Sequence, residues 1–233
     1  MFLRETSDAL THRPNVVGIV DSPRALSIAQ TLDPDDVDIL ELRVDMFSSG
    51  QDKLLKGIKE LSHPLLVTVR HPQEGGANSL TAAARRELFS GFLPYASLVD
   101  IELRSLESLG DIISKARAQG VKLVYSYHNF QSTPSHARLF ELARRALLAE
   151  ADVCKLAVLT NTPVDLALLL TFLSKQKRIH LSLMGMGKFG KISRLALAQA
   201  GSVLNYGYLE KPNVTGQWSA RELKARISEL ISA

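Results

Sequence analysis

The chain has 233 residues, of which 45% are hydrophobic and 22% are charged, a composition typical of a globular protein with one sizeable core. Its net charge of +4 comes from 28 basic and 24 acidic residues scattered along the chain, which argues against a nucleic-acid partner. The single cysteine excludes an internal disulfide, the amino terminus lacks the apolar stretch of a signal peptide, and the longest apolar run, 166–173, is too short for a membrane span, so we expect a cytoplasmic protein without membrane contact.

Short apolar runs rich in Val, Ile and Leu alternate with longer amphipathic stretches along the whole chain, a pattern typical of βαβ units and a parallel sheet. The predicted strands are 16–20, 38–45, 65–70, 98–103, 121–128, 153–159, 180–186 and 203–208. The predicted helices are 23–32, 51–61, 80–93, 106–119, 135–149, 164–177, 192–200 and 219–232. Eight strands, each followed by a helix, predict an α/β fold: one (β/α)₈ TIM barrel domain over residues 1–233, with eight parallel strands.

Local signals support several of these helix boundaries. Ser135 begins an N-cap-like start, Pro163 fits a first helical turn, and Gly120 and Gly201 fall just past helix ends. The short basic clusters at 85–86, 144–145 and 175–178 lie in helix-like stretches, where we expect them to form solvated helix faces.

Charged residues recur on one side of the predicted strands. Side chains alternate along a strand, so the apolar residues at 40, 42 and 44 should face the helices while the charged residues at 41, 43 and 45 face the barrel interior. The same parity predicts an inward set made of Glu41, Arg43, Asp45, Arg70, Asp100, Glu102, His128 and Lys155. Buried charges must be paired, and these lie toward the carboxyl ends of their strands, where barrel enzymes place their chemistry. The alternative, charges in water on edge strands or loops, is disfavoured because five strands share the parity.

Lys155 lies between apolar strand residues, where an ammonium is costly to bury and a neutral amine is a nucleophile toward carbonyls. His128 ends an earlier strand on the same inward parity, and imidazole is suited to accept and return a proton near neutral pH. Together the two residues predict an imine at Lys155 with proton transfer by His128. A structural ion pair between Lys155 and a carboxylate is the alternative. Met184 and Met186 share the inward parity and are expected to pack as an apolar wall, whereas Cys154 faces away from Lys155.

Several segments recur in the order found in one family. They are ELRVD at 41–45, TVR at 68–70 followed by EGG at 74–76, VDIEL at 99–103, YHNF at 127–130, KLAV at 155–158, MGMG at 184–187 with GKISR at 190–194, and GQ at 216–217. Together they closely resemble type I 3-dehydroquinate dehydratase, a lyase of the shikimate pathway, over about the whole chain.

The resemblance implies dehydration of 3-dehydroquinate to 3-dehydroshikimate through a Schiff base, in chorismate and aromatic amino-acid biosynthesis, without a metal or organic cofactor. The family's functional residues match positions in this chain: Lys155 for the imine-forming lysine, His128 for the acid/base, Glu74 for the acid that orients this histidine, Glu41, Arg43 and Arg70 for the groups that hold the substrate hydroxyls and ring, and Arg194 with Gln217 for the carboxylate-binding pair. It also implies a homodimer.

Two features depart from the family pattern. Asn213 stands where a serine is common, four residues before Gln217, and a short amino-terminal lead-in suggests that the hairpin plugging the barrel bottom is reduced or missing. The segment 210–216 would carry Gln217 to the site, and we interpret it as a closing lid, with an ordinary surface turn as the alternative.

Two other functions fit part of the pattern. A class I aldolase would share the imine at Lys155 but break a carbon–carbon bond, and it does not account for Arg43, Arg70 and Arg194 beside His128. A barrel that only binds a carboxylate metabolite would need neither the lysine nor the histidine.

Overall fold

The computed structural model describes residues 14–47 and 50–231, and the expectation about the amino-terminal hairpin lies outside these residues. Its strands are β1 (Asn15–Val20), β2 (Ile39–Arg43), β3 (Leu65–Thr68), β4 (Leu98–Glu102), β5 (Lys122–Asn129), β6 (Val153–Leu159), β7 (His180–Met186) and β8 (Leu204–Tyr208). Its α-helices are α2 (Pro23–Ala29), α3 (Gln51–Gly57), α4 (Ala82–Phe92), α5 (Gly110–Ala118), α6 (His136–Leu148), α7 (Pro163–Lys175), α8 (Gly190–Gln199) and α9 (Ala220–Ile231). None of the helices in this described part is long and apolar enough to cross a bilayer.

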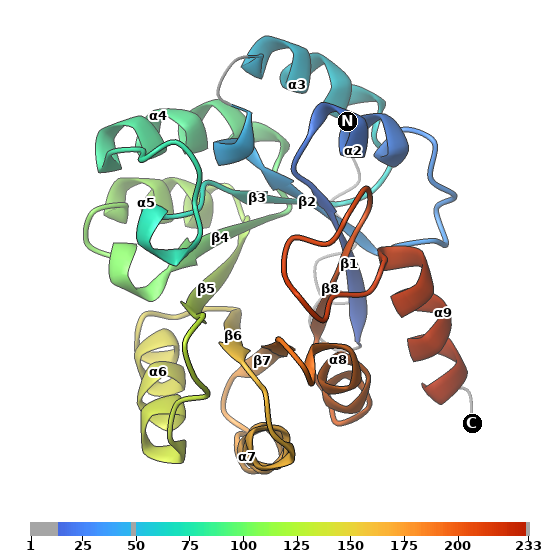
Figure 1. Ribbon diagram of the computed structural model, residues 1–233. Coiled ribbons are helices and arrows are strands. Elements are labelled where there is room, and N and C mark those ends of the chain that lie inside the picture. Colours follow the sequence, from blue (N-terminus) through green and yellow to red (C-terminus); the bar gives the residue numbers. More distant parts are fainter. Residues whose placement is uncertain (1–13, 48–49, 232–233) are drawn as a thin grey trace.

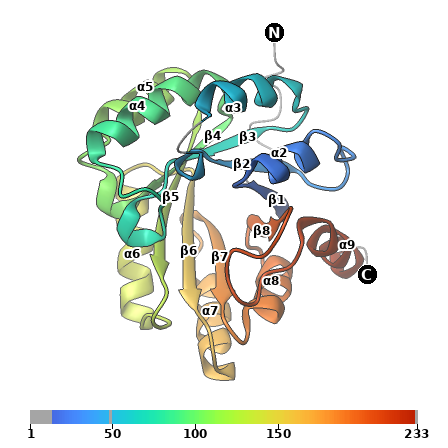
Figure 2. The ribbon, with the colours of Figure 1, turned by 45° about the horizontal axis from the view of Figure 1, so that its top comes forward.

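The eight strands form one parallel sheet in the order β7-β6-β5-β4-β3-β2-β1-β8. Hydrogen bonds between β7 and residues 202–204 bridge the seam between β7 and β8, two of them made by Ser202 Oγ with Leu183. The Val203 amide donates to the Leu181 carbonyl at 2.9 Å, and Ser182 Oγ donates to the Leu204 carbonyl at 2.6 Å. The result is a nearly closed barrel with the helices around its outside (Figures 1 and 2). The predicted fold is confirmed.

Two hydrophobic clusters divide the core into layers. The outer cluster lies between strands and helices and includes Leu40, Leu42 and Val44, as the strand parity predicts. The inner cluster fills the barrel and includes Met184 and Met186. On each strand, the residues that alternate in step with its members of the inner cluster therefore point into the barrel.

The predicted helix boundaries agree with local capping. Ser135 accepts a hydrogen bond from the Arg138 amide at the start of α6, and Pro163 is in the first turn of α7. Gly120 and Gly201, with φ of +71° and +109°, follow the ends of α5 and α8. These positive φ values explain why glycine occupies both positions.

Several predicted strands and helices are too long; the helix predicted at 23–32, for example, ends at Ala29. Asp45 lies in a 3₁₀ turn (Val44–Met46) after β2, and Arg70 lies two residues beyond β3. The helix predicted to start at 106 begins at Gly110, because a 3₁₀ turn (Leu103–Ser105) and further turn residues at 106–109 follow β4. These turns follow the carboxyl ends of β2 and β4, so their residues project over the barrel mouth rather than continuing the sheet.

We expect Gly207→Ala to destabilise the barrel, because a Cβ at Gly207 would lie 2.5 Å from the Ala220 Cα at the start of α9. The cost of such overpacking is about 2 kcal/mol, measurable by urea unfolding. Gly91→Ala in α4 is the matched control: nothing lies within 4 Å of its added Cβ, and helix propensity predicts a gain of about 0.5–1 kcal/mol. An unaffected Gly207→Ala protein would contradict the close packing of β8 on α9.

Candidate active site

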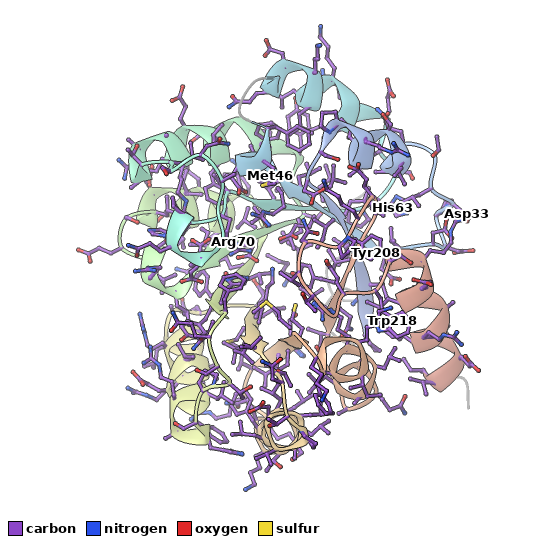
Figure 3. The ribbon with its side chains drawn as sticks, viewed as in Figure 1. Asp33, Met46, His63, Arg70, Tyr208 and Trp218 are labelled. Atoms are coloured by element: carbon purple, nitrogen blue, oxygen red, sulfur yellow. The ribbon has the colours of Figure 1, made fainter. Side chains whose placement is uncertain are left out.

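The carboxyl ends of β2 to β6 bring the predicted inward charges together. Asp100 on β4 is the central acceptor: it receives Arg70 Nη1 at 2.9 Å and Nη2 at 2.8 Å, Ser126 Oγ at 2.5 Å and Lys155 Nζ at 2.8 Å. Burial opposes ionisation of Asp100, but the cations Arg70 and Lys155 hold its pKa well below the usual value. Figure 3 labels Arg70 on the side of the barrel formed by these strands.

Lys155 is buried, with 4% of its surface exposed, and its amine has three neighbours. Besides Asp100, Glu41 Oε1 lies 3.6 Å from Nζ, and the ring centroid of Tyr206 lies 3.9 Å from it. Thr68 Oγ1 donates to the same Glu41 oxygen at 2.8 Å. The alternative of an ion pair at Lys155 is therefore present in the structure, and it holds the amine at a fixed place on the inner face.

His128 and Lys155 lie on the inner face of neighbouring strands. In the register of β5 and β6, Ser126 pairs with Lys155. His128 pairs with Ala157, two residues nearer the barrel mouth. Val124 and Ala157 belong to the inner cluster, which fixes the parity of both strands. The two side chains thus emerge on one side of the sheet, as a shared reaction requires.

The His128 ring is oriented by Glu74, which lies in the 3₁₀ turn Pro72–Glu74 after β3. Glu74 Oε2 is 3.0 Å from His128 Nδ1 and also accepts the His128 backbone amide at 3.0 Å. This pairing leaves Nε2 as the ring nitrogen for a ligand.

The protonation of this pair is set by its surroundings. Burial, followed by the positive charges of Arg70 and Lys155, lowers the pKa of His128 well below its ordinary value. Burial, together with the charge of Glu102, raises the pKa of Glu74 to about 7. His128 is therefore a neutral imidazole near pH 7, ready to accept a proton.

Arg43 stabilises the loop that carries Glu74. Its guanidinium binds both oxygens of Asp45, at 3.1 and 2.9 Å, and donates to the Gly75 carbonyl at 3.1 Å. Asp45 in turn accepts the backbone amides of Arg70 and Ala77. Arg43 and Asp45 thus tie the carboxyl end of β2 to the segment after β3.

The prediction of a solvated basic face is wrong for Arg85, which is 1% exposed. Its Nη2 pairs with Glu102 Oε2 at 2.5 Å, and Glu102 Oε1 accepts Arg70 Nη1 at 3.0 Å. Glu102 also accepts the His71 amide at 2.9 Å. A buried chain of charges therefore runs from helix α4 through Glu102 to Arg70.

Arg194 on α8 is buried and, within the described residues, has no carboxylate partner. Its hydrogen bonds go to backbone carbonyls: Nε donates to Tyr206, and Nη1 to Gly185, Gly190 and Gly216. Burial lowers its pKa to about 10, so it remains charged at neutral pH. A buried cation without a counter-charge favours an anionic ligand.

The loop between β8 and α9 places Gln217 beside Arg194, whose Nη1 holds the preceding carbonyl. Gln217 is 5% exposed, and its Oε1 accepts the Asn213 amide at 2.9 Å. The Asn213 side chain is directed to Asp21, to which its Nδ2 donates. The Asn213 side chain therefore contacts the residue that follows β1.

The same loop covers the barrel mouth, where Figure 1 shows it in front of β1 and β8. Val214 packs against the inner cluster, Gly187 donates its amide to the Thr215 carbonyl at 2.8 Å, and Ser22 Oγ donates to Glu210 Oε2 at 2.5 Å. These contacts argue against an ordinary surface turn. That the loop opens as a lid stays a prediction.

Six of the eight residues predicted for the site lie at the carboxyl ends of β2 to β6, and the other two, Arg194 and Gln217, lie at the loop between β8 and α9. Other residues that the sequence did not assign to the site contact them. Asp100 and Tyr206 had a signal, the inward parity of a polar side chain on a strand. Arg85 had none, because a helix pattern does not say what an arginine faces. Cys154 lies in the outer cluster, as predicted, and burial raises its pKa to about 12. Over residues 14–47 and 50–231, no group of His, Cys, Asp and Glu is arranged to hold a metal.

The raised pKa of Glu74 predicts a pH-dependent stability. Because the folded pKa of about 7 exceeds the ordinary 4.5, the folded state binds more protons between these values, and its stability falls as pH rises through this window. Glu74→Gln should remove at most about 3 kcal/mol of this dependence in urea unfolding between about pH 4.5 and 7. Glu87→Gln, at an exposed position of α4, is the control and should leave the slope unchanged. Identical slopes for Glu74→Gln and the unsubstituted protein would refute the assignment.

Comparison with known proteins identifies the family. A family model described as type I 3-dehydroquinase matches residues 17–230. The 3-dehydroquinate dehydratase of Hydrogenobaculum sp. (strain Y04AAS1) is 38% identical over 190 residues, which cover 80% of this chain and 85% of the relative. The solved 3-dehydroquinate dehydratase of Geobacillus kaustophilus HTA426 has a TM-score of 0.85 and 28% identity, covering 94% of this chain and 92% of its own. The type I enzyme of Clostridium difficile, solved with covalently modified comenic acid, has a TM-score of 0.85 and 25% identity, covering 95% of this chain and 94% of its own. This chain belongs to the type I 3-dehydroquinase family.

Proposed function

We propose that this chain dehydrates 3-dehydroquinate to 3-dehydroshikimate through an imine on Lys155, with His128 as the acid/base. The observation that carries the proposal is the placement of a buried amine and a neutral imidazole on the inner face of adjacent strands, Lys155 on β6 and His128 on β5. The names of the relatives support the substrate. The Clostridium difficile enzyme holds covalently modified comenic acid, which is consistent with covalent catalysis in that enzyme.

The first half of the reaction forms the imine. Lys155 loses a proton to His128, and the neutral amine attacks the substrate carbonyl carbon to give a carbinolamine. The protonated His128 then returns the proton to the carbinolamine hydroxyl, which leaves as water. The resulting iminium withdraws electrons from the neighbouring carbon.

The second half removes the substrate hydroxyl. Neutral His128 takes the proton from the carbon next to the iminium, giving an enamine, and then donates it to the departing hydroxyl. Elimination creates the carbon–carbon double bond and a second water. Hydrolysis of the conjugated imine returns the carbonyl oxygen and frees Lys155. The steps draw only on side chains, and no cofactor is part of the proposal.

The substrate would be held from two sides. Arg194, with its uncompensated charge, and Gln217 bind the carboxylate, because a guanidinium offers it two parallel donors. Glu41 and Arg43 lie at the opposite side of the amine and hold the hydroxyls. Arg70 is committed to Asp100, Glu102 and Ser126, so we assign it to ring positioning through these partners.

We further propose a homodimer in the cytoplasm that serves chorismate and aromatic amino-acid biosynthesis. The family resemblance supports the dimer and the pathway, and the buried single cysteine is consistent with a reducing compartment. A class I aldolase is the second candidate because it would also use the Lys155 amine. An absorbance assay for the conjugated enone product separates the two.

Sodium borohydride with 3-dehydroquinate should reduce the imine and modify Lys155. The adduct blocks tryptic cleavage after Lys155, so mass mapping should show the peptide 146–175 with the added mass in place of 146–155. Lys155→Ala should lose both the adduct and the activity. Lys122→Ala is the control: Lys122 pairs with Asp152 at the start of β5, and adduct formation should persist. Modification of another lysine, with Lys155 untouched, would overturn the proposal.

His128→Ala should still form the trapped adduct on Lys155 but turn over about 10²- to 10⁴-fold more slowly, because general acid–base transfer is lost while the amine remains. Steady-state rates of enone formation measure this change. His136→Ala at the start of α6, outside the barrel, is the control with full activity. Wild-type turnover in His128→Ala would remove the role assigned to this residue.

A further inference from the structure

Tyr206 on β8 carries a buried hydroxyl for which the protein offers no partner. The side chain is 2% exposed and belongs to the inner cluster. Among the residues of the described ranges, none forms a hydrogen bond with its Oη. Because burying an unpaired hydroxyl is unfavourable, this position calls for a partner from outside the chain.

The ring of Tyr206 lies against the reactive amine. Lys155 Nζ lies 3.9 Å from the ring centroid, within the range of a cation–π contact. The charges of Glu41, Asp100 and Arg70 all act on the phenol. The Tyr206 carbonyl accepts Arg194 Nε at 3.2 Å, so the same residue connects the amine to the guanidinium assigned to the substrate carboxylate.

The phenol remains a hydrogen-bond donor throughout the neutral range. Burial, followed by the negative charges of Glu41 and Asp100, raises the pKa of Tyr206 well above its ordinary value. A protonated phenol can donate one hydrogen bond. The acceptor next to the Lys155 nitrogen during the reaction is the oxygen on the carbon that this nitrogen attacks.

We propose that Tyr206 is a further catalytic residue, whose hydroxyl donates a hydrogen bond to the carbonyl oxygen of the substrate as Lys155 attacks the carbonyl carbon. This inference rests on the proposed function. The carbonyl oxygen gains negative charge as the new carbon–nitrogen bond forms, so the hydrogen bond strengthens toward the transition state. No bond to Tyr206 forms or breaks, and its proton stays on the phenol. The ring also faces the nitrogen when it carries positive charge as ammonium or iminium.

Tyr206→Phe tests the proposal because it keeps the ring and removes only the hydroxyl. We expect the rate of adduct formation on Lys155, measured by rapid borohydride quenching with 3-dehydroquinate, to fall by about a hundredfold to a thousandfold, as for loss of one oxyanion donor. The thermal unfolding midpoint should stay equal or rise, because the hydroxyl has no partner among the described residues. Tyr125→Phe is the matched control, since Tyr125 on β5 lies in the outer cluster, and its adduct rate should be unchanged.

An adduct rate in Tyr206→Phe equal to that of the unsubstituted protein would overturn the proposal. A lower unfolding midpoint with an unchanged rate would overturn it as well, because the hydroxyl would then have a structural role. Both results leave the adduct on Lys155 and therefore the proposed function intact. Failure of the unsubstituted protein to form any adduct on Lys155 would instead overturn the proposed function.

Discussion

The active site depends on the ion pairs made by the Asp100 carboxylate, which is buried at the carboxyl end of β4. It accepts hydrogen bonds from both terminal nitrogens of the Arg70 guanidinium and from the amine of Lys155, so one negative charge fixes two cations, one just after β3 and one on β6. A barrel interior of low polarity makes an unpaired charge costly and a shared one strong. The amine is held over the ring of Tyr206 because its own partner is held by Arg70.

The network extends outward from the barrel to the helices. Glu102 binds Arg70 with one oxygen and Arg85 of α4 with the other, and it also holds the amide of His71. His71 precedes the turn that carries Glu74, and Glu74 orients the His128 ring. The position of the His128 ring therefore depends on contacts made in the layer between strands and helices. Burial, followed by the positive charges of Arg70 and Lys155, lowers the pKa of His128 and keeps this imidazole neutral.

The opposite side of the site is built for a negative charge. The Arg194 guanidinium donates to backbone carbonyls and has no carboxylate among its described neighbours. Arg43, Arg70 and Arg85, in contrast, each form an ion pair with a carboxylate. The loop that carries Gln217 reaches Arg194 through the Gly216 carbonyl and covers the mouth with Val214. The site thus combines a neutralised set of charges near the amine with one uncompensated cation under the loop, an asymmetry that suits a substrate with hydroxyls at one end and a carboxylate at the other.

The barrel and the inward parity could be predicted from residue patterns, because strand alternation and helix capping are local properties of the chain. Glu74, Arg194 and Gln217 lie outside the strands, and only the family resemblance pointed to them. Glu41, His128 and Lys155 could be placed on one inner face from alternation alone. The ends of the strands could not, since the turns at Asp45 and after Glu102 form against neighbouring strands rather than from their own residues. The partners of these side chains also depend on the folded chain. Arg85 has the sequence pattern of a solvated helix residue but pairs with Glu102, and the Asn213 side chain donates to Asp21. Such pairings join residues far apart in the chain, and no local pattern encodes which charge will meet which.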